Sequence, residues 1–176
     1  GSAGPESHEV SQTVSIGDDL LRQIGLISLS SSQERIAREL PFCLDERGFV
    51  VDPIDEMCSY LDATKADILS VVETLQKTVE PVGVFAWSLR DCFRIQWEAA
   101  NRWDPLILQL LDRLELVARQ DLTGICELCG VDLEDAADMV ADIRRLRPAP
   151  LASETNMTPR QAEPELKFRA DQDGEI

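Results

Sequence analysis

The sequence contains a single histidine, His8, which lies in a polar leader. The body of the chain therefore has no histidine for a Ser-His or Cys-His catalytic arrangement. A glycine-rich phosphate-binding loop is also missing. The many carboxylates fall at expected helix caps or on polar helix faces. These absences predict a protein that is not an enzyme and needs no cofactor.

Long hydrophobic runs and basic residues are scarce as well. No run reaches the roughly 18 apolar residues that predict a membrane span, and no signal peptide is visible. The chain has 17 Lys and Arg against 33 Asp and Glu, a net charge of −16. Phosphate backbones would repel such a surface, whereas a basic protein surface would complement it. The other interpretation is that the acidity only keeps the chain soluble.

The five cysteines occur without a secretory signal, which indicates a reducing, cytoplasmic location. Cys126 and Cys129 form a lone CxxC, whereas a zinc site needs about four ligands and a thioredoxin-like site needs a βαβ context. We interpret all five as small apolar residues of helical stripes. A zinc or redox site at Cys126 and Cys129 is the alternative.

Residues 79–99 are predicted to contain the central helix of the protein. Pro81 and Gly83 predict a turn. Ser88 followed by Asp91 predicts an N-cap with an acidic third residue. The helix that follows is apolar on more than one face, which is typical of a helix buried between neighbours. The apolar residues are Leu89, Cys92, Phe93, Ile95, Trp97, Ala99 and Ala100.

Helical spacing of apolar residues recurs through the rest of the chain. The first two expected helices cover residues 18–27, with Leu26 inward, and residues 31–47, with a capping box at Ser31 to Glu34, a bend at Pro41 and an end at Gly48. The next two cover residues 52–61, capped by Asp52 and Pro53, and residues 64–78, capped by Thr64. After the central helix, one helix is expected after Asp104 with its apolar seam from 106 to 117, followed by helices over residues 121–130 and 132–147. Residues 49–51 are predicted to be a short extended connector of little importance.

These patterns predict an all-α fold with two small helical subdomains. A helical bundle is expected over residues 17–101, followed by a helix-turn-helix-like three-helix unit over residues 102–150. Residues 1–16 are predicted to be a disordered leader that begins with a cloning scar, Gly1 to Gly4. Residues 151–176 are predicted to be a disordered acidic tail.

The helix-turn-helix outline of residues 121–146 raises the possibility of DNA binding. In such motifs the first residues of the second helix approach base edges. Here that helix begins with Asp132, Glu134 and Asp135 and continues with Asp138 and Asp142. Carboxylates would be repelled by phosphates, so a structural unit or a protein contact is the favoured interpretation.

Tryptophan and arginine are the residues most typical of protein-binding hot spots. The tryptophans can pack between helices, or Trp87 and Trp103 can anchor a partner. Arg90 and Arg94 are one turn apart and could share that surface. The candidate partner-contact residues are Trp87, Arg90, Arg94, Trp103, Arg144, Arg145 and Arg147.

Three segments carry a resemblance to a known family: Leu44 to Phe49 (LDERGF), Pro81 to Gln96 (PVGVFAWSLRDCFRIQ) and Ile143 to Pro148 (IRRLRP). Together with the order of helices, they resemble the core-binding region of the enhancer-dependent bacterial sigma factors, the sigma-54 class. The family usually has a Gly-Val-Gly-Ala-Arg-like turn before the central helix. This chain has Gly83-Val84-Phe85-Ala86-Trp87, which puts any contact of that arginine in doubt.

The resemblance implies a region that binds core RNA polymerase. The parent protein would direct polymerase to promoters and await an ATP-driven activator. Contacts with the activator ATPase and with promoter DNA are expected through other regions of the parent, and this piece is expected to be monomeric and cytoplasmic. The alternatives are a stand-alone helical adaptor that binds another protein and a DNA-binding helix-turn-helix module.

Overall fold

The computed structural model describes residues 16–102 and 104–155, and in this part of the chain it is helical without a β-strand. The predicted all-α class is therefore confirmed. A first helix covers residues 16–25. The elements that follow are α2 (Ser31–Glu39), the 3-10 helix η1 (Leu40–Cys43), α3 (Ile54–Leu61), α4 (Lys65–Thr78), α5 (Leu89–Ala99), α6 (Pro105–Leu111), α7 (Leu114–Ala118), α8 (Leu122–Cys129), α9 (Leu133–Arg144) and α10 (Pro150–Thr155).

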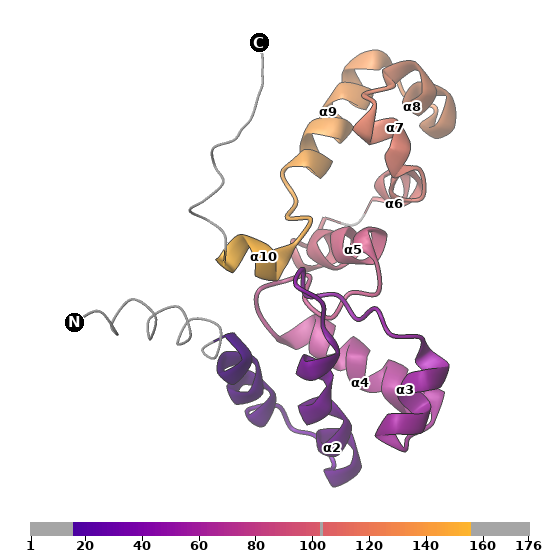
Figure 1. The fold of residues 1–176 in the computed structure, drawn as a ribbon. Helices are drawn as coiled ribbons and strands as arrows, with labels where there is room; N and C mark the ends of the chain where they lie inside the picture. The colour runs from indigo at the N-terminus through magenta and orange to yellow at the C-terminus, as the bar shows by residue number, and fades with distance from the viewer. Residues whose placement is uncertain (1–15, 103, 156–176) are drawn as a thin grey trace, which may run out of the picture.

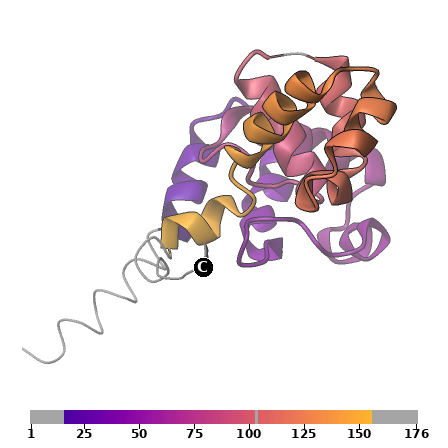
Figure 2. The same ribbon diagram turned by 90° about the horizontal axis from the view of Figure 1, so that it is seen from above.

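The helices gather at two ends of the molecule with α5 between them (Figure 1). The first helix, α2, α3 and α4 lie at one end, and we call residues 16–87 the N-terminal body. Helices α6 to α9 lie at the other end, and we call residues 104–146 the C-terminal unit. After α9 the chain returns, and α10 lies beside the first helix in both views (Figures 1 and 2). Helix α5 thus has the central position predicted for it.

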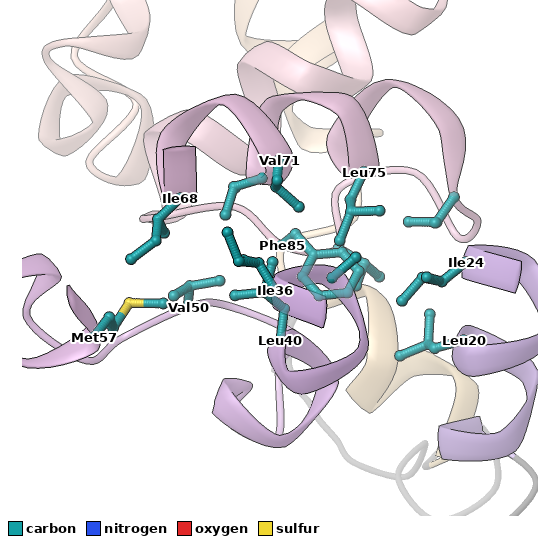
Figure 3. Packing of buried hydrophobic residues seen from close by; sticks show 14 of the residues in the cluster. Leu20, Ile24, Ile36, Leu40, Val50, Met57, Ile68, Val71, Leu75 and Phe85 are labelled. Atoms are coloured by element: carbon teal, nitrogen blue, oxygen red, sulfur yellow. The ribbon is translucent and has the colours of Figure 1, made fainter. Parts of the chain in front are cut away.

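The N-terminal body has one apolar core, to which α4 contributes Ile68, Val71 and Leu75. Phe85 lies between α4 and the side chains of α2 in the middle of this core (Figure 3). Leu20 and Ile24 close it from the first helix, whereas the predicted inward residue Leu26 is 76% exposed. Leu26 follows the last helical turn, so the helical spacing does not extend to it.

The C-terminal unit has a second core between α6, α7, α8 and α9. Ala136, Met139, Val140 and Ile143 of α9 are buried, as the spacing predicted. The predicted single helix through residues 106–117 is wrong, because the chain breaks at Asp112 and Arg113 into α6 and α7. The break turns the two short helices so that both contact α8.

Helix α5 contributes to both cores through different faces. Phe93 and Trp97 belong to the core of the C-terminal unit, while Cys92 and Ile95 pack in a small cluster with residues of the N-terminal body. The N-cap prediction is confirmed, since the Asp91 N–H donates to Ser88 Oγ. Ala99 and Ala100 were wrongly predicted to be inward, because both are exposed at the end of the helix.

The short connector at residues 49–51 matters more than its length suggested. Phe49 and Val50 are both 1% exposed, and isolated backbone bridges pair Val50 with Leu44 and Phe49 with Ala86. The Phe85 N–H donates to the Gly48 carbonyl at 2.8 Å. Gly48, with φ of 100°, therefore forms a tight turn within this bridged segment. The prediction that Gly48 ends a helix is therefore wrong.

Several cap predictions are wrong by one residue. The capping box of α2 is formed by Ser30 and Gln33 instead of Ser31 and Glu34. Helix α3 begins after Pro53 without a side-chain cap, because the Asp52 carboxylate accepts a hydrogen bond from the Tyr60 hydroxyl instead. The cap of Thr64 on α4 and those of Asp104, Asp121 and Asp132 on α6, α8 and α9 are confirmed.

The predicted bend at Pro41 is confirmed, because α2 ends and η1 begins there.

The predicted boundaries at the chain ends are only partly confirmed. Residues 151–155, predicted as the start of a disordered tail, continue α10, and Leu151 packs into the core of the N-terminal body. The remaining residues of the predicted leader and tail, apart from Ile16, lie outside the described residues. The division into two subdomains stays a prediction.

Candidate protein-docking surface

An apolar groove lies where the start of α5 meets α7 and the end of α9, and we call it the α5–α9 groove. It has a volume of about 300 Å³. Leu89 and Phe93 line it from α5, and among the described residues Arg144 is its only charged lining residue. The full lining is Leu89, Phe93, Leu114, Val117, Ala118, Ile143, Arg144, Leu146 and Pro148.

A second hollow, the α4–α5 cleft, separates α4 from the other side of α5. Its volume is about 530 Å³, and its lining includes Glu73, Lys77, Arg94 and Glu98. Both signs of charge meet there, and the Lys77 ammonium already pairs with Glu73 at 2.9 Å. The cleft is therefore an internally compensated surface, unlike the α5–α9 groove.

Arg90 and Arg94 do not share one surface, although they are one turn apart. Arg90 pairs with Asp112 at the break between α6 and α7, whereas Arg94 lines the α4–α5 cleft and pairs with Asp91 and Glu98. Burial alone would lower the pKa of Arg94, but these carboxylates outweigh it and raise that pKa. Arg94 is thus held by its own helix, and Arg90 ties α5 to the C-terminal unit.

Trp87 is half-buried against the core of the N-terminal body. Its backbone N–H donates to the Asp91 carboxylate at 3.0 Å. In a capping box this carboxylate would instead accept from the N–H of the N-cap residue, Ser88. Trp97 is buried, with the Arg102 guanidinium over its ring at 4.3 Å from the centroid. Trp103, the other tryptophan among the candidate contact residues, lies outside the described residues.

The three arginines near the end of α9 have different surroundings. Arg144 is exposed, and its guanidinium donates only weakly, at 3.5 Å, to the Val117 carbonyl. Arg145 pairs with Asp142 at 2.8 Å. The backbone of Arg147 is held by the Gln96 side chain, which accepts from its N–H at 2.9 Å and donates to its carbonyl at 2.7 Å.

Three glutamines bind groups that lie elsewhere in the chain, and sequence reasoning missed all of them. Gln23 binds the backbone N–H and carbonyl of Glu80 just as Gln96 binds those of Arg147. Gln76, only 8% exposed, donates to the Phe85 carbonyl and to Asp91. The sequence feature that could have indicated them was a glutamine beside an apolar helical stripe. That pattern does not predict which distant backbone group the glutamine side chain will bind.

The connector after α9 passes very close to the turn before α5. A Cβ on Gly83, whose φ is 107°, would lie 2.9 Å from both Cys92 Sγ and Pro150 Cγ. The Cys92 thiol also donates to the Arg147 carbonyl. Glycine is therefore required at residue 83 both by its backbone conformation and by this close approach. The contact fixes the last turns of the described chain against the central helix.

The five cysteines are free thiols, three of them with a raised pKa. Burial raises the pKa of Cys92 to about 11 and also raises the pKa of Cys43 and Cys129. Cys129 is buried and Cys126 half-buried in the core of the C-terminal unit. Within residues 16–102 and 104–155, no cluster of His, Cys, Asp and Glu is placed to hold a metal ion.

The helix-turn-helix-like unit presents carboxylates at the start of its second helix. Asp132 caps α9, and Glu134, Asp135 and Asp138 are exposed. Leu133 beside them is 59% exposed. This is the end of the helix that such motifs direct toward bases, and its charge would be repelled by DNA phosphates.

The described residues thus form an all-helical module organised around one buried helix, with arginines and an apolar groove on its surface. None of the described helices is both long and apolar enough to traverse a bilayer. Residues 6–176 match the family model described as the sigma-54 factor, core binding domain. The chain belongs to the sigma-54 factor family, as the resemblance predicted.

Known relatives agree with this assignment. The chain is similar to RNA polymerase sigma-54 factor 2 of Bradyrhizobium diazoefficiens, at 34% identity over 85% of this chain and 28% of the relative. It is also similar to the RNA polymerase sigma-54 factor of Sinorhizobium fredii, at 39% identity over 80% of this chain and 27% of the relative. The factor of Caulobacter vibrioides is 38% identical over 76% of this chain and 27% of the relative. The chain therefore spans less than a third of the length of these relatives.

Proposed function

We propose that this chain docks onto core RNA polymerase as the core-binding region of a sigma-54 factor. The observation that carries the proposal is the match of residues 6–176 to the core-binding domain of that family. The net charge of −16 favours a basic protein surface over a nucleic acid as its main partner. We assign docking to the surface around α5 and α9, which includes Arg90, Arg144 and Arg145.

The same proposal gives the parent protein a role in promoter-directed initiation that waits for an activator ATPase. Contacts with promoter DNA and with the activator are assigned to regions outside this chain. We further propose that the chain works in the cytoplasm and is a monomer. The exposed acidic start of α9 supports an absence of DNA reading by this unit.

The test is binding of the fluorescently labelled chain to purified core polymerase, with full-length sigma-54 as the competitor. We expect salt-sensitive binding that the full-length factor displaces. A stand-alone adaptor would bind another protein and would not be displaced in this way. Absence of binding to core enzyme, together with tight binding to duplex DNA at low salt, would overturn the proposal in favour of a DNA-binding module.

A further inference from the structure

The α5–α9 groove differs in charge from the rest of the molecule. Over the whole chain, acidic residues outnumber basic ones by 33 to 17. At the groove, however, Arg144 is a lining residue, and Arg90, Arg113, Arg119 and Arg147 each directly precede or follow a lining residue along the chain. Among the described residues, the lining of this apolar hollow thus includes one guanidinium group and no carboxylate, on an otherwise acidic protein.

One of these arginines, Arg144, has no carboxylate partner within the described residues. Its guanidinium donates there only to the Val117 carbonyl, at 3.5 Å. Arg119, at the end of α7 next to the lining residue Ala118, is exposed and helps to lower the pKa of Glu115. In a chain with such an excess of carboxylates, an arginine without a carboxylate partner beside an apolar surface leaves capacity for a carboxylate from outside.

The carboxylates near the groove are already engaged. Asp112 pairs with Arg90, Glu115 pairs with Arg113 at 2.6 Å, and Asp142 pairs with Arg145 and with Arg102. A new ion pair forms at lower cost where no existing pair has to be broken first, and opposite charges across an interface favour the matching partner. Arg144 is therefore the groove arginine that remains without a carboxylate partner among the described residues.

We infer that the α5–α9 groove takes a short protein segment that presents large apolar side chains next to a carboxylate. The apolar side chains would fill the hollow against Phe93 and Val117, and the carboxylate would reach Arg144. The volume of about 300 Å³ suits a few side chains rather than a folded domain. This inference rests on the proposed function, because the segment is assigned to core polymerase.

The first test compares groove variants with matched controls in binding to core polymerase. Ala118→Trp fills the groove from an exposed lining position, and Ala137→Trp makes the same change at an exposed position of α9 away from it. Arg144→Glu reverses a lining charge, and Arg38→Glu makes the same change at an exposed position of α2, away from the groove. We expect each groove variant to weaken binding about tenfold or more and each control to stay within about twofold.

Folding of each variant is checked by circular dichroism and thermal melting. We expect all four variants to fold, because all four substituted residues are exposed. If the unsubstituted chain binds polymerase and the groove variants bind equally well, the inference is overturned while the proposed function stands. If the unsubstituted chain does not bind polymerase at all, the proposed function fails, and the second test decides the inference.

The second test uses two designed helical peptides with the same leucine and phenylalanine positions. One carries glutamates beside the apolar residues, and the other carries lysines there. We expect the glutamate peptide to shift the methyl resonances of Val117, Ala118 and Ile143 and to bind about tenfold more tightly than the lysine peptide. Arg144→Glu should abolish that preference. Equal binding of both peptides, binding of neither, or a preference for lysine would overturn the inference.

Discussion

The N-terminal body and the C-terminal unit are both helical, but they are held together differently. The N-terminal body adds distant polar ties to its apolar core: the Gln76 amide binds the Phe85 carbonyl, and the Arg35 guanidinium binds the carbonyls of Leu61 and Asp62. It also contains the bridged segment around Phe49. The C-terminal unit relies mainly on apolar packing of short helices close in sequence.

This difference teaches where each region is vulnerable. A helical unit built on local apolar spacing loses stability in proportion to the apolar volume removed. A body that adds a buried polar tie, such as that of Gln76, to an apolar core also loses stability when one partner of the tie is deleted, because the other partner is left unsatisfied. The four substitutions below test this distinction, beginning with the largest expected effect.

Phe85→Ala is expected to have the largest effect. Phe85 is fully buried in the N-terminal body, and truncation of a core phenylalanine costs about 3–5 kcal/mol of unfolding free energy. Its φ of 73° is unusual for a bulky residue; the family resemblance places a glycine here, which tolerates that φ. The loss is measured by urea unfolding and by amide hydrogen exchange of each helix.

The matched control is Ile125→Ala, which truncates a fully buried side chain of the C-terminal unit. We expect Phe85→Ala to reduce exchange protection mainly in α2 and α4, and Ile125→Ala mainly in α8 and α9. Equal loss in both regions for both variants would mean one cooperative unit and would contradict the predicted division into two subdomains.

Gln76→Leu tests the buried polar tie. The substitution keeps the approximate volume but removes the amide that donates to the Phe85 carbonyl at 2.8 Å and to Asp91 at 3.1 Å. We expect a loss of about 1–3 kcal/mol in urea unfolding. Gln109→Leu in the C-terminal unit also removes a bond to a carbonyl, that of Leu128, but Gln109 is exposed, so we expect less than about 0.5 kcal/mol. Equal losses would contradict the comparison.

The Asp45 carboxylate makes the N-terminal body sensitive to acid. Burial alone would raise its pKa, but hydrogen bonds from the Phe49 N–H and from Arg47 together lower that pKa below its ordinary value of 3.8. A carboxyl whose pKa is depressed in the folded state stabilises fully above the unfolded pKa, and the stabilisation is lost as the pH falls through the folded value. We therefore expect the free energy of unfolding to fall as the pH drops below 3.8 and through the lowered pKa of the folded state.

The measurement is thermal melting from neutral pH down to acid conditions, for the unsubstituted chain and for Asp45→Asn. The variant should lack this part of the acid-induced loss. Glu115→Gln is the control in the C-terminal unit, because the pKa of Glu115 is also lowered, by Arg113, but its side chain is 49% exposed and solvent screens the pair. A larger change in the pH profile from Glu115→Gln than from Asp45→Asn would refute this account.

Cys126→Ser is expected to have the smallest effect. The side chain is half-buried at the edge of the second core and holds no metal-binding position within the described residues. We expect a folded variant that loses no more than about 1 kcal/mol, with no metal in either protein by elemental analysis. Cys58→Ser, at an equally half-buried position on α3, should behave alike. Stoichiometric zinc lost on substitution would instead support the alternative metal site.

Local features were predictable because their causes lie within a few residues. The caps at Thr64, Ser88 and Asp132 and the inward spacing of α4 and α9 follow from hydrogen bonds and helical periodicity inside one segment. The errors at Ser31 and Asp52 arose where neighbouring residues compete for one cap, or where a distant group claims the side chain, as Tyr60 does with Asp52.

The candidate site was predictable as a set of residue types but not as a surface. Arg90 and Arg94 are neighbours on one helix, yet their guanidinium groups lie on different sides of it. The reason is that Arg90 pairs with Asp112 and Arg94 pairs with Asp91. The clamp of Gln96 on Arg147 joins residues 51 positions apart. Whether either set meets polymerase stays a prediction.

By itself, the sequence determined the helical class, most of the helix starts, the acidic character and the family, because each depends on composition or on short-range pattern. Only the tertiary structure decided that α5 packs with a different face into each half, that residue 83 must be glycine, and that an arginine-bordered groove exists. Those features arise where segments far apart in the chain come into contact, and the spacing of residues within one segment carries no information about which other segment it will meet.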